Sequence, residues 1–251
     1  MDRRNFFKRS ALTGMAMVSI PEIVKAALSK ADHNEAKYTL SKGNILLFQG
    51  DSITDCGRNR KDENEANKQS QLGSGYALFA AANLLANQAD KELKIYNRGI
   101  SGNKVFQLAD RWEKDCIHLK PDILSILIGI NDFWHTQTKA YNGTIGKYET
   151  DYRNLLIRSR NELGGVKIVV CEPFIIYGGS ALNNTWEQKF APYRKVAQSL
   201  AEELELTFVP FQAVFNEALK KAPAKYWGPD GVHPSMAGTQ LMAQAWLKVV
   251  L

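Results

Sequence analysis

A serine, an aspartate and a histidine stand in short stretches of this chain whose composition suits nucleophilic chemistry. Ser52 follows Gly50 and Asp51 at the end of an apolar run, and Asp230 precedes His233 by three positions in the Gly- and Pro-rich turn "YWGPDGVHPSMAG". A serine hydroxyl becomes a good nucleophile when a base accepts its proton, and an imidazole oriented by a carboxylate is such a base. These residue types predict Ser52 as nucleophile, His233 as base and Asp230 as the group that orients the imidazole. The alternative for Ser52 alone is that it caps a following helix.

The rest of the chain alternates between apolar runs and helical patterns, which indicates how these residues are positioned. Short apolar runs predict strands at 44–50, 93–100, 121–132, 166–174 and 206–211. Apolar residues at helical spacing predict helices at 73–88, 105–119, 148–163, 186–205, 213–222 and 234–250. Such alternation favours a parallel sheet covered on both faces, because a parallel connection needs a crossover. The predicted fold class is therefore α/β, with ligands bound at the carboxyl ends of the strands.

The composition is that of an ordinary globular protein. The chain has 251 residues, of which 45% are apolar and 23% charged, enough for one core and one domain. Of the formal net charge of +6, five basic and two acidic residues within positions 1–26 contribute +3. The remaining +3 is too small to indicate a nucleic acid or an anionic membrane as partner.

Residues 1–26 are interpreted as an export signal. Arg3 and Arg4 precede two phenylalanines and a lysine, followed by a short, weakly apolar stretch and small residues near "IVKA". This resembles a twin-arginine signal, so we expect a periplasmic or extracellular protein with a polar spacer at 27–42 and the folded domain at 43–251. The apolar stretch is short of the roughly 20 residues that a membrane span needs, so we expect no stable membrane insertion of the mature domain. The alternative is an amphipathic helix that belongs to the mature protein.

The cysteines favour neither a disulfide framework nor a zinc site. There are three, Cys56, Cys116 and Cys171, with no close pair. Cys56 lies close to Ser52, but no basic residue adjoins it, so we interpret it as a packed small residue and not as a nucleophile. We expect no metal and no organic cofactor, because the imidazole would activate the hydroxyl.

Four motifs, in this order, resemble those of the GDSL or SGNH family of serine hydrolases. They are "GDSIT" (50–54), "ISGNK" (100–104), "GIND" (129–132) and "DGVHP" (230–234), each at a predicted strand end or loop. A single motif would be weak evidence, but four in order between residue 44 and the end of the chain make chance improbable. The resemblance implies a three-layer α/β/α sandwich around a mainly parallel, five-stranded, flavodoxin-like sheet. It also implies acyl transfer through Ser52, His233 and Asp230.

The same resemblance implies an oxyanion hole built from three donors. These are the backbone N–H groups of Ser52 and Gly102 and the side-chain amide of Asn131. Glycine at position 102 is physically sensible, because a side chain there would block the approach of the substrate oxygen. Asp51 and Asp132 are assigned to holding their loops by hydrogen bonds, and Asp51 is also a candidate for substrate contact.

Aromatic side chains near the expected site are candidates for binding a sugar ring. Trp134 and Trp227 are predicted to contact substrate, and Tyr177 and Trp186 lie in or beside the same loops. Flat aromatic faces suit sugar rings, although each of these side chains could instead pack against the core.

Basic residues and the other histidines near the motifs have competing interpretations. A run after the nucleophile motif would either bind an acidic sugar or form solvated surface: Arg58, Arg60 and Lys61. Of the remaining histidines, His135 is the one considered for substrate contact. The other two are interpreted as structural or surface residues: His33 and His118.

We expect an esterase that removes short acyl groups, above all acetyl, from carbohydrate, as the carbohydrate acetylesterases of the resembled family do. A lysophospholipase or a thioesterase is the nearest alternative, but the sequence has no long apolar insertion suited to a lipid chain. A non-catalytic glycan-binding module would be expected to lack a triad or oxyanion residue, and all of them are present. Transfer of the acyl group to a second sugar needs the same residues and stays open.

Overall fold

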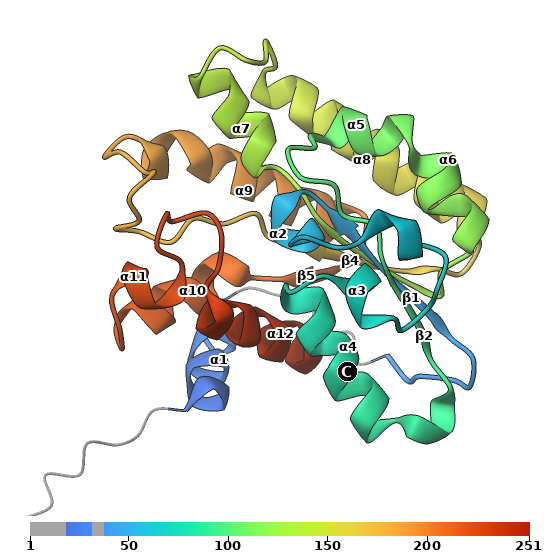
Figure 1. Cartoon of the computed structure of the whole chain (residues 1–251). Helices are drawn as coiled ribbons and strands as arrows, with labels where there is room; N and C mark the ends of the chain where they lie inside the picture. Colours follow the sequence, from blue (N-terminus) through green and yellow to red (C-terminus); the bar gives the residue numbers. More distant parts are fainter. Residues whose placement is uncertain (1–18, 32–37) are drawn as a thin grey trace, which may run out of the picture.

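The computed structural model of the protein describes residues 19–31 and 38–251 and centres on one β-sheet (Figure 1). Five strands, all parallel, form the sheet in the order β2-β1-β3-β4-β5. Their bounds are Ile45–Gly50 (β1), Lys94–Asn97 (β2), Ile123–Leu127 (β3), Lys167–Cys171 (β4) and Thr207–Val209 (β5). Helices cover both faces, which confirms the predicted α/β/α sandwich.

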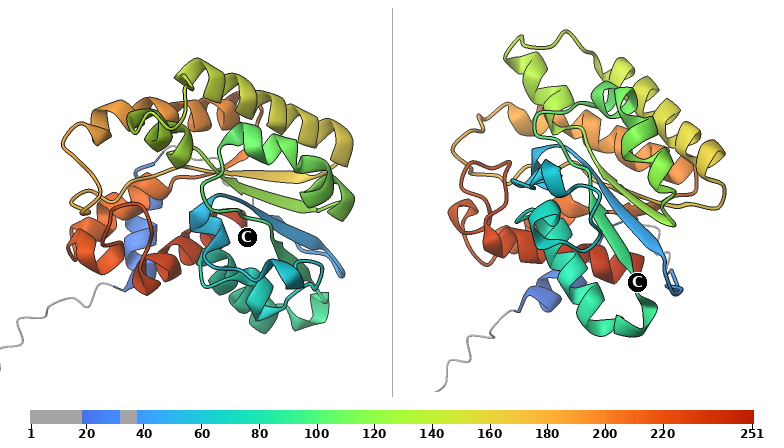
Figure 2. Two further views of the ribbon diagram at one scale, coloured as in Figure 1. Left: turned by 45° about the horizontal axis from the view of Figure 1, so that its top comes forward. Right: turned by 45° about the vertical axis from the view of Figure 1, so that its right-hand side comes forward.

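The two layers of helices are built from separate parts of the chain (Figures 1 and 2). One layer contains α4 (Tyr76–Asn87), α10 (Phe211–Leu219) and α12 (Met236–Val250). The other contains α5 (Val105–Asp110), α6 (Trp112–Asp115), α8 (Ile145–Leu163) and α9 (Trp186–Glu203). Helix α4 packs on α12, and α8 packs on both α5 and α9.

The central strands are mostly apolar because the helices bury both of their faces. Every residue of β3 is buried. On one face, Trp246 of α12 lies 5.1 Å from the ring of Phe48 and donates its indole N–H to the hydroxyl of Ser125 at 2.9 Å. On the other face, Trp112 donates its indole N–H to Ser159 Oγ at 3.0 Å. Each large ring thus buries its apolar body and still pairs its polar atom.

Short helical elements lie in the connections between the larger ones. The α-helical segments are α2 (Ser52–Asp55), α3 (Gln69–Leu72), α7 (Ile130–Gln137) and α11 (Ala224–Trp227). The 3₁₀ segments are η1 (Arg60–Asp62), η2 (Ala89–Lys91) and η3 (Ile117–Leu119).

The predicted strands at 93–100, 121–132, 166–174 and 206–211 all run past the observed strand ends, and the predicted helix at 105–119 is broken. The helix predicted at 105–119 is divided into α5, α6 and η3. The two breaks fall at Arg111, whose φ and ψ are −108° and 6°, and at Cys116, whose φ and ψ are −136° and −62°. The strand predicted at 121–132 ends at Leu127, because Gly129 has a φ of 137° and α7 begins directly after it. Apolar residues keep their helical spacing across a break of one residue, so the sequence pattern did not reveal the breaks in the helix. An apolar run likewise does not show the residue at which a strand ends.

The N-terminal helix α1 (Ile20–Leu28) packs on α10 and α12. Its buried side chains are Ile23, Val24, Ala27 and Leu28, and Lys30 forms an ion pair with Glu217 of α10 at 2.8 Å. This helix crosses the boundary predicted at residue 26. The paired arginines and His33 lie outside the described residues, so the export signal stays a prediction.

The predicted spacer at 27–42 also contacts the domain where it is described. The backbone N–H of Tyr38 donates to the carbonyl of Val250 at 2.8 Å, and Leu40 is buried in the core. In the part of the chain that the structure describes, no helix combines the length and the apolar character that a bilayer crossing requires.

Candidate active site

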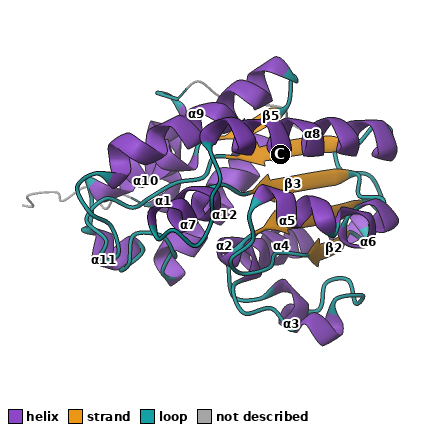
Figure 3. Ribbon diagram, turned by 90° about the horizontal axis from the view of Figure 1, so that it is seen from above, coloured by secondary structure: helices purple, strands orange, loops and turns teal. Residues whose placement is uncertain are grey.

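Ser52 and His233 meet at the carboxyl end of the sheet. Ser52 is the first residue of α2 and is separated from β1 by Asp51 alone, and His233 lies in the loop before α12. Figure 3 shows strands β2 and β3 pointing towards the end of the sheet where α2 and α7 lie. The hydroxyl of Ser52 lies 2.9 Å from His233 Nε2, although 181 positions separate the two residues. Parallel strands make this possible, since their carboxyl ends share one edge.

The carboxylate of Asp230 holds the His233 ring from the opposite side. Asp230 Oδ2 lies 2.7 Å from His233 Nδ1, and Oδ1 accepts the backbone N–H groups of Val232 and His233 at 2.9 and 2.8 Å. Partial burial would raise the pKa of Asp230, but these hydrogen bonds outweigh it and hold the pKa below its usual range. The ionised carboxylate favours the tautomer with its proton on Nδ1, which leaves Nε2 free to accept the Ser52 proton.

The local sequence explains why β1 ends by presenting Ser52. Asp51, and not Ser52, caps α2, because Asp51 Oδ1 accepts the backbone N–H of Ile53 at 3.0 Å. Gly50 has a φ of 157°, and a Cβ atom there would lie 2.3 Å from the carbonyl oxygen of Leu127. The glycine therefore permits the close approach of the strands, the aspartate starts the helix, and the serine hydroxyl remains available to His233.

The predicted oxyanion donors have free hydrogens in the described part of the chain. No acceptor pairs with the backbone N–H of Ser52 or of Gly102 there. Gly102 has a φ of 81°, and a Cβ atom there would have no neighbour within 4 Å. The glycine is thus required by its left-handed backbone. The empty space beside it has room for the substrate oxygen that the sequence motif implied.

The side-chain amide of Asn131 is oriented by its neighbour Asn103. Asn131 Nδ2 donates one hydrogen to the carbonyl oxygen of Asn103 at 3.3 Å and keeps a second hydrogen free. Asn131 is 6% exposed and lies in the first turn of α7. The amide can therefore present its remaining N–H to a ligand oxygen.

Arg111 is a residue of this site that the sequence did not reveal. Its Nε donates to Asn103 Oδ1 at 2.9 Å, and its Nη2 lies 3.4 Å from the carbonyl oxygen of Gly50. Its Nη1 donates to the carbonyl of Arg98 at 2.8 Å and to Asp115 at 2.9 Å. One guanidinium thus joins the loops after β1 and β2. In the sequence Arg111 is one polar position of an amphipathic pattern, which gives no sign of this role.

Two buried carboxyl groups, Asp51 and Asp132, flank the site. Both accept backbone hydrogen bonds, as the sequence analysis assigned. Asp51 is fully buried, and burial raises its pKa to about 7, with Asp132 adding to the rise and the Ile53 hydrogen bond opposing it. Burial also raises the pKa of Asp132 to about 7, although Oδ1 accepts the backbone N–H of Val105 at 3.2 Å. A fully buried Asp51 cannot reach a substrate, contrary to the prediction that it contacts one.

The aromatic candidates divide between core and surface. Trp227 is 4% exposed and donates its indole N–H to the carbonyl oxygens of Ala218 and Ala222, which makes it a core residue and not the predicted substrate contact. Trp134 is half-buried and packs 5.2 Å from the ring of Trp186, itself a buried side chain. Trp134 therefore keeps an exposed part that a substrate could reach.

Tyr177 lies in the loop between β4 and α9, which borders the Asp230 turn. It is half-buried and lines a surface cavity of about 490 Å³ together with Trp186 and Asn183. Within the same loop, the backbone N–H of Ala181 donates to the carbonyl of Asp230 at 3.0 Å. The predicted place of Tyr177 near the site therefore agrees with the structure.

Two of the three basic residues after the nucleophile motif, Arg58 and Arg60, are bonded to other parts of the protein. The side chain of Arg58 is 1% exposed, and its Nε donates to the carbonyl of Gly99 at 2.7 Å. Arg60 pairs at 3.5 Å with Asp55, which also accepts the backbone N–H and the hydroxyl of Ser101. Both arginines thus support the loop that carries Gly102. Lys61 is exposed.

The side chains of the two remaining candidates have partners outside the proposed triad. Cys56 makes a 3.4 Å contact with the hydroxyl of Ser74, and His118 lies on the surface 3.2 Å from Glu113. The described ranges contain no group of three or more His, Cys, Asp or Glu side chains placed to hold a metal ion.

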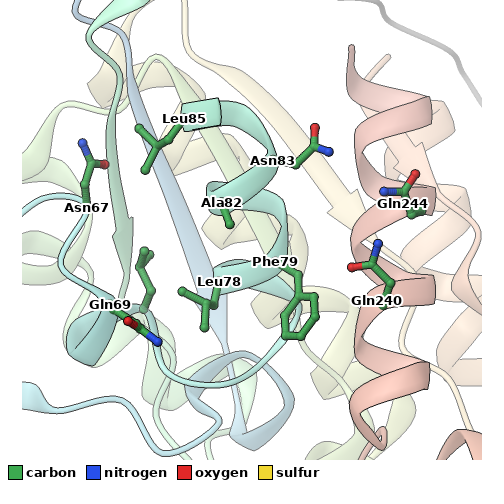
Figure 4. Close-up of a pocket in the computed structure, with 10 residues that line it drawn as sticks. Asn67, Gln69, Leu78, Phe79, Ala82, Asn83, Leu85, Gln240 and Gln244 are labelled. Carbon is green, nitrogen blue, oxygen red and sulfur yellow. The ribbon is translucent and has the colours of Figure 1, made fainter. Parts of the chain in front are cut away.

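A second cavity, of about 540 Å³, opens between α4 and α12 (Figure 4). Leu78 and Phe79 of α4 line it, with Gln240 and Gln244 of α12 on the facing side. It contains no residue of the predicted site. Its lining carries no ionisable side chain, so it offers no acid–base chemistry.

An α/β sheet that brings a serine, a histidine and an aspartate into line at its carboxyl edge has the arrangement of a serine hydrolase. Residues 48–241 match the GDSL-like lipase/acylhydrolase family, so the chain belongs to that family, as the motifs predicted. The protein is accordingly an esterase of the GDSL/SGNH type.

Relatives with known names extend this comparison. An acetylxylan esterase from Geobacillus stearothermophilus is 38% identical over 217 residues, which cover 84% of this chain and 95% of that protein. The solved structure of the acetylxylan esterase Axe2 from the same organism has a TM-score of 0.74 at 35% identity, covering 84% of this chain and 95% of that one. A structure from Parabacteroides merdae, a GDSL-like lipase candidate, has a TM-score of 0.83 at 52% identity and covers 85% and 98%.

The structures of Axe2 include three that are named as catalytic mutants. In these a serine, a histidine or an aspartate is replaced by alanine. The aspartate stands three positions before the histidine in Axe2, as Asp230 stands before His233 here.

Proposed function

We propose that this esterase hydrolyses acetyl esters on carbohydrate through Ser52, His233 and Asp230. The observation that carries the proposal is the continuous line of hydrogen bonds, 2.9 Å from Ser52 to His233 and 2.7 Å from His233 to Asp230. The similarity to an acetylxylan esterase over 95% of that protein's length supports acetyl as the acyl group and a saccharide as the alcohol.

The geometry supports the following sequence of steps. Ser52 Oγ attacks the ester carbonyl while His233 Nε2 takes its proton, and Asp230 stabilises the imidazolium that forms. The backbone N–H groups of Ser52 and Gly102 and the amide of Asn131 donate to the oxyanion of the tetrahedral intermediate. His233 then protonates the leaving sugar oxygen. Water, deprotonated by His233, hydrolyses the acetyl-enzyme and frees Ser52.

The test is hydrolysis of 4-nitrophenyl acetate, butyrate and octanoate by the wild type and by Ser52→Ala. We expect Ser52→Ala to lose nearly all activity, by about 10⁶-fold in kcat, which is the loss measured for the nucleophile of subtilisin. A variant as active as the wild type would remove Ser52 from the mechanism. Preference for octanoate over acetate would favour the lysophospholipase or thioesterase alternative.

The saccharide is tested separately by acetate release from acetylated xylan. Release by the wild type and not by Ser52→Ala supports the proposed substrate. Hydrolysis of 4-nitrophenyl acetate with no release of acetate from any acetylated polysaccharide would overturn the carbohydrate part of the proposal and leave the esterase.

We also propose that the protein is exported to the periplasm or beyond the cell. The support is the paired-arginine pattern at the start of the chain. Replacing Arg3 and Arg4 with lysine and measuring esterase activity in cell fractions tests this proposal. Activity that stays in the same fraction after the replacement would contradict it.

A further inference from the structure

Lys104 and His135 form a hydrogen-bonded pair beside the proposed oxyanion donors. Lys104 Nζ lies 3.2 Å from His135 Nδ1, in a hydrogen bond that is only partly buried. Lys104 directly follows Asn103, whose carbonyl orients the amide of Asn131. His135 stands four positions after Asn131 on α7. Residues at this spacing share one helix face with Cβ atoms about 6 Å apart, so the pair lies one helical turn from the proposed oxyanion hole.

The pair presents only hydrogen-bond donors. An ammonium group has no acceptor, so His135 Nδ1 must accept from Lys104, and the ring hydrogen then lies on Nε2. Burial lowers the pKa of His135 and the charge of Lys104 lowers it further, which favours the neutral ring. Among the described residues, no second partner of Lys104 Nζ and no partner of His135 Nε2 is found. Their remaining N–H groups are available to a ligand.

The ammonium of Lys104 also lacks a carboxylate partner. Lys104 is 7% exposed, and no carboxylate oxygen of a described residue lies within 4.0 Å of Nζ. Burial lowers the pKa of Lys104 and the charge of Asp132 opposes this fall. Asp132 Oδ1 accepts the backbone N–H of Val105 and Oδ2 is buried without a hydrogen-bond partner, so neither oxygen is bonded to Nζ. The rings of Phe106 and Tyr141 lie 5.6 and 5.3 Å from Nζ. Aromatic faces attract a cation but leave its charge uncancelled.

The geometry points to a subsite for a carboxylate group of the saccharide, formed by Lys104 Nζ and His135 Nε2. A hydroxyl group would bring a proton for which this subsite has no acceptor, whereas a carboxylate accepts from both donors and pairs with the ammonium. The inference rests on the proposed function and specifies its substrate class as acetylated saccharides with a uronic acid close to the acetyl group.

The test compares two inhibitors of 4-nitrophenyl acetate hydrolysis, a xylooligosaccharide with a glucuronic acid branch and the same oligosaccharide without it. We expect the acidic oligosaccharide to bind the wild type at least about tenfold more tightly, which is the order of a charge-assisted hydrogen bond. Lys104→Met and His135→Leu should each bring the ratio of the two inhibition constants close to one. Lys104→Arg keeps the charge and should retain part of the preference.

Lys94→Met is the matched control, because Lys94 is an exposed lysine at the amino end of β2, opposite the edge that holds the site, and should leave the ratio unchanged. The ratio is taken within each variant, and thermal melting shows whether the variant is folded. Equal inhibition of the wild type by both oligosaccharides, or a preference that survives Lys104→Met, overturns the subsite. Absence of acetate release from the acetylated forms of both oligosaccharides would instead overturn the proposed substrate, and the inhibition constants would still decide the subsite.

Discussion

Arg111 donates through Nε to the side-chain oxygen of Asn103 at 2.9 Å, and the carbonyl of Asn103 accepts the amide of Asn131. The guanidinium is largely buried, and burial lowers its pKa against the opposing effect of Asp115, but an arginine remains charged. This contact places a structural side chain two hydrogen bonds from the proposed oxyanion site. Its removal should therefore affect the transition state through Asn131.

Replacing Arg111 with leucine should lower kcat about 10- to 100-fold while KM changes little, since a misplaced oxyanion donor loses part of its effect. Steady-state kinetics with 4-nitrophenyl acetate measures both constants. Asp115→Asn is the control, because it weakens the 2.9 Å ion pair with Arg111 and leaves Asn103 in place. Equal losses of kcat in the two variants, with equal losses of stability, would reduce Arg111 to a general structural role.

Replacing Asn131 with alanine should lower kcat by about 100- to 1,000-fold, or about 2.7 to 4 kcal/mol of transition-state stabilisation. The reason is that its free N–H would donate to the oxyanion only after the ester carbonyl has been attacked. KM for 4-nitrophenyl acetate should stay within a few-fold of the wild type. A rise in KM at constant kcat would show that Asn131 binds the ground state.

Replacing Gly102 with alanine strains the backbone and also fills space beside the substrate oxygen. Comparison with Gly43→Ala separates these two effects. Gly43 is the matched control, because its φ of 79° equals the 81° of Gly102 within a few degrees and its Cβ also would meet nothing within 4 Å. Both variants should lose about 1 kcal/mol of stability, measured by urea unfolding. Only Gly102→Ala should lose kcat/KM. Similar activity in the two variants would contradict the role of Gly102 beside the substrate oxygen.

Replacing Asp51 with asparagine should stabilise the protein more at neutral than at acidic pH. The pKa of Asp51 is raised from 3.8 to about 7, so between these values the folded state holds a proton that the unfolded chain releases. The stability of the wild type therefore falls as pH rises through this window, by at most about 1.4 kcal/mol per pH unit for this group. Asparagine can still accept the Ile53 N–H and cap α2.

Urea unfolding of Asp51→Asn at pH 4.5 and pH 7 measures this effect against the wild type. The stability difference between variant and wild type should move in favour of the variant by up to about 3 kcal/mol between the two pH values. Asp110→Asn, at an exposed position of α5, serves as the control. A difference that does not change with pH would contradict the raised pKa of Asp51.

A chain that begins at residue 29 should be less stable than one that begins at residue 19, because it lacks α1. Removing this helix exposes the face of α10 and α12 that Ile23, Val24 and Leu28 cover. Each apolar side chain is worth roughly 1.5 to 3 kcal/mol when fully buried, so the loss should be several kcal/mol. Thermal melting measures it. Equal melting temperatures would make α1 dispensable, and cleavage near residue 26 would then be structurally harmless.

Local sequence patterns were sufficient to predict the pair of Asp230 with His233, the strands and the sheet edge at which Ser52 lies. Asp230 and His233 lie in one tight turn, so their contact needs only the chain between them. The strands appear as apolar runs because both faces of a parallel sheet are buried, which also makes the edge that holds Ser52 predictable. Their alternation with helical patterns defined the α/β class without reference to any long-range contact.

The tertiary structure decided which side chains face the site and which face the core. Trp227 and Arg58 seemed available to a sugar by their place in the sequence, but the fold buries both and pairs their N–H groups with carbonyl oxygens. Arg111 and Lys104 gave no sequence signal, and His135 was considered for substrate contact without any sign that it pairs with Lys104, because the partners of these residues lie in other loops. The direction in which a polar side chain points depends on packing between segments distant in the chain, and the periodicity of one segment carries no information about it.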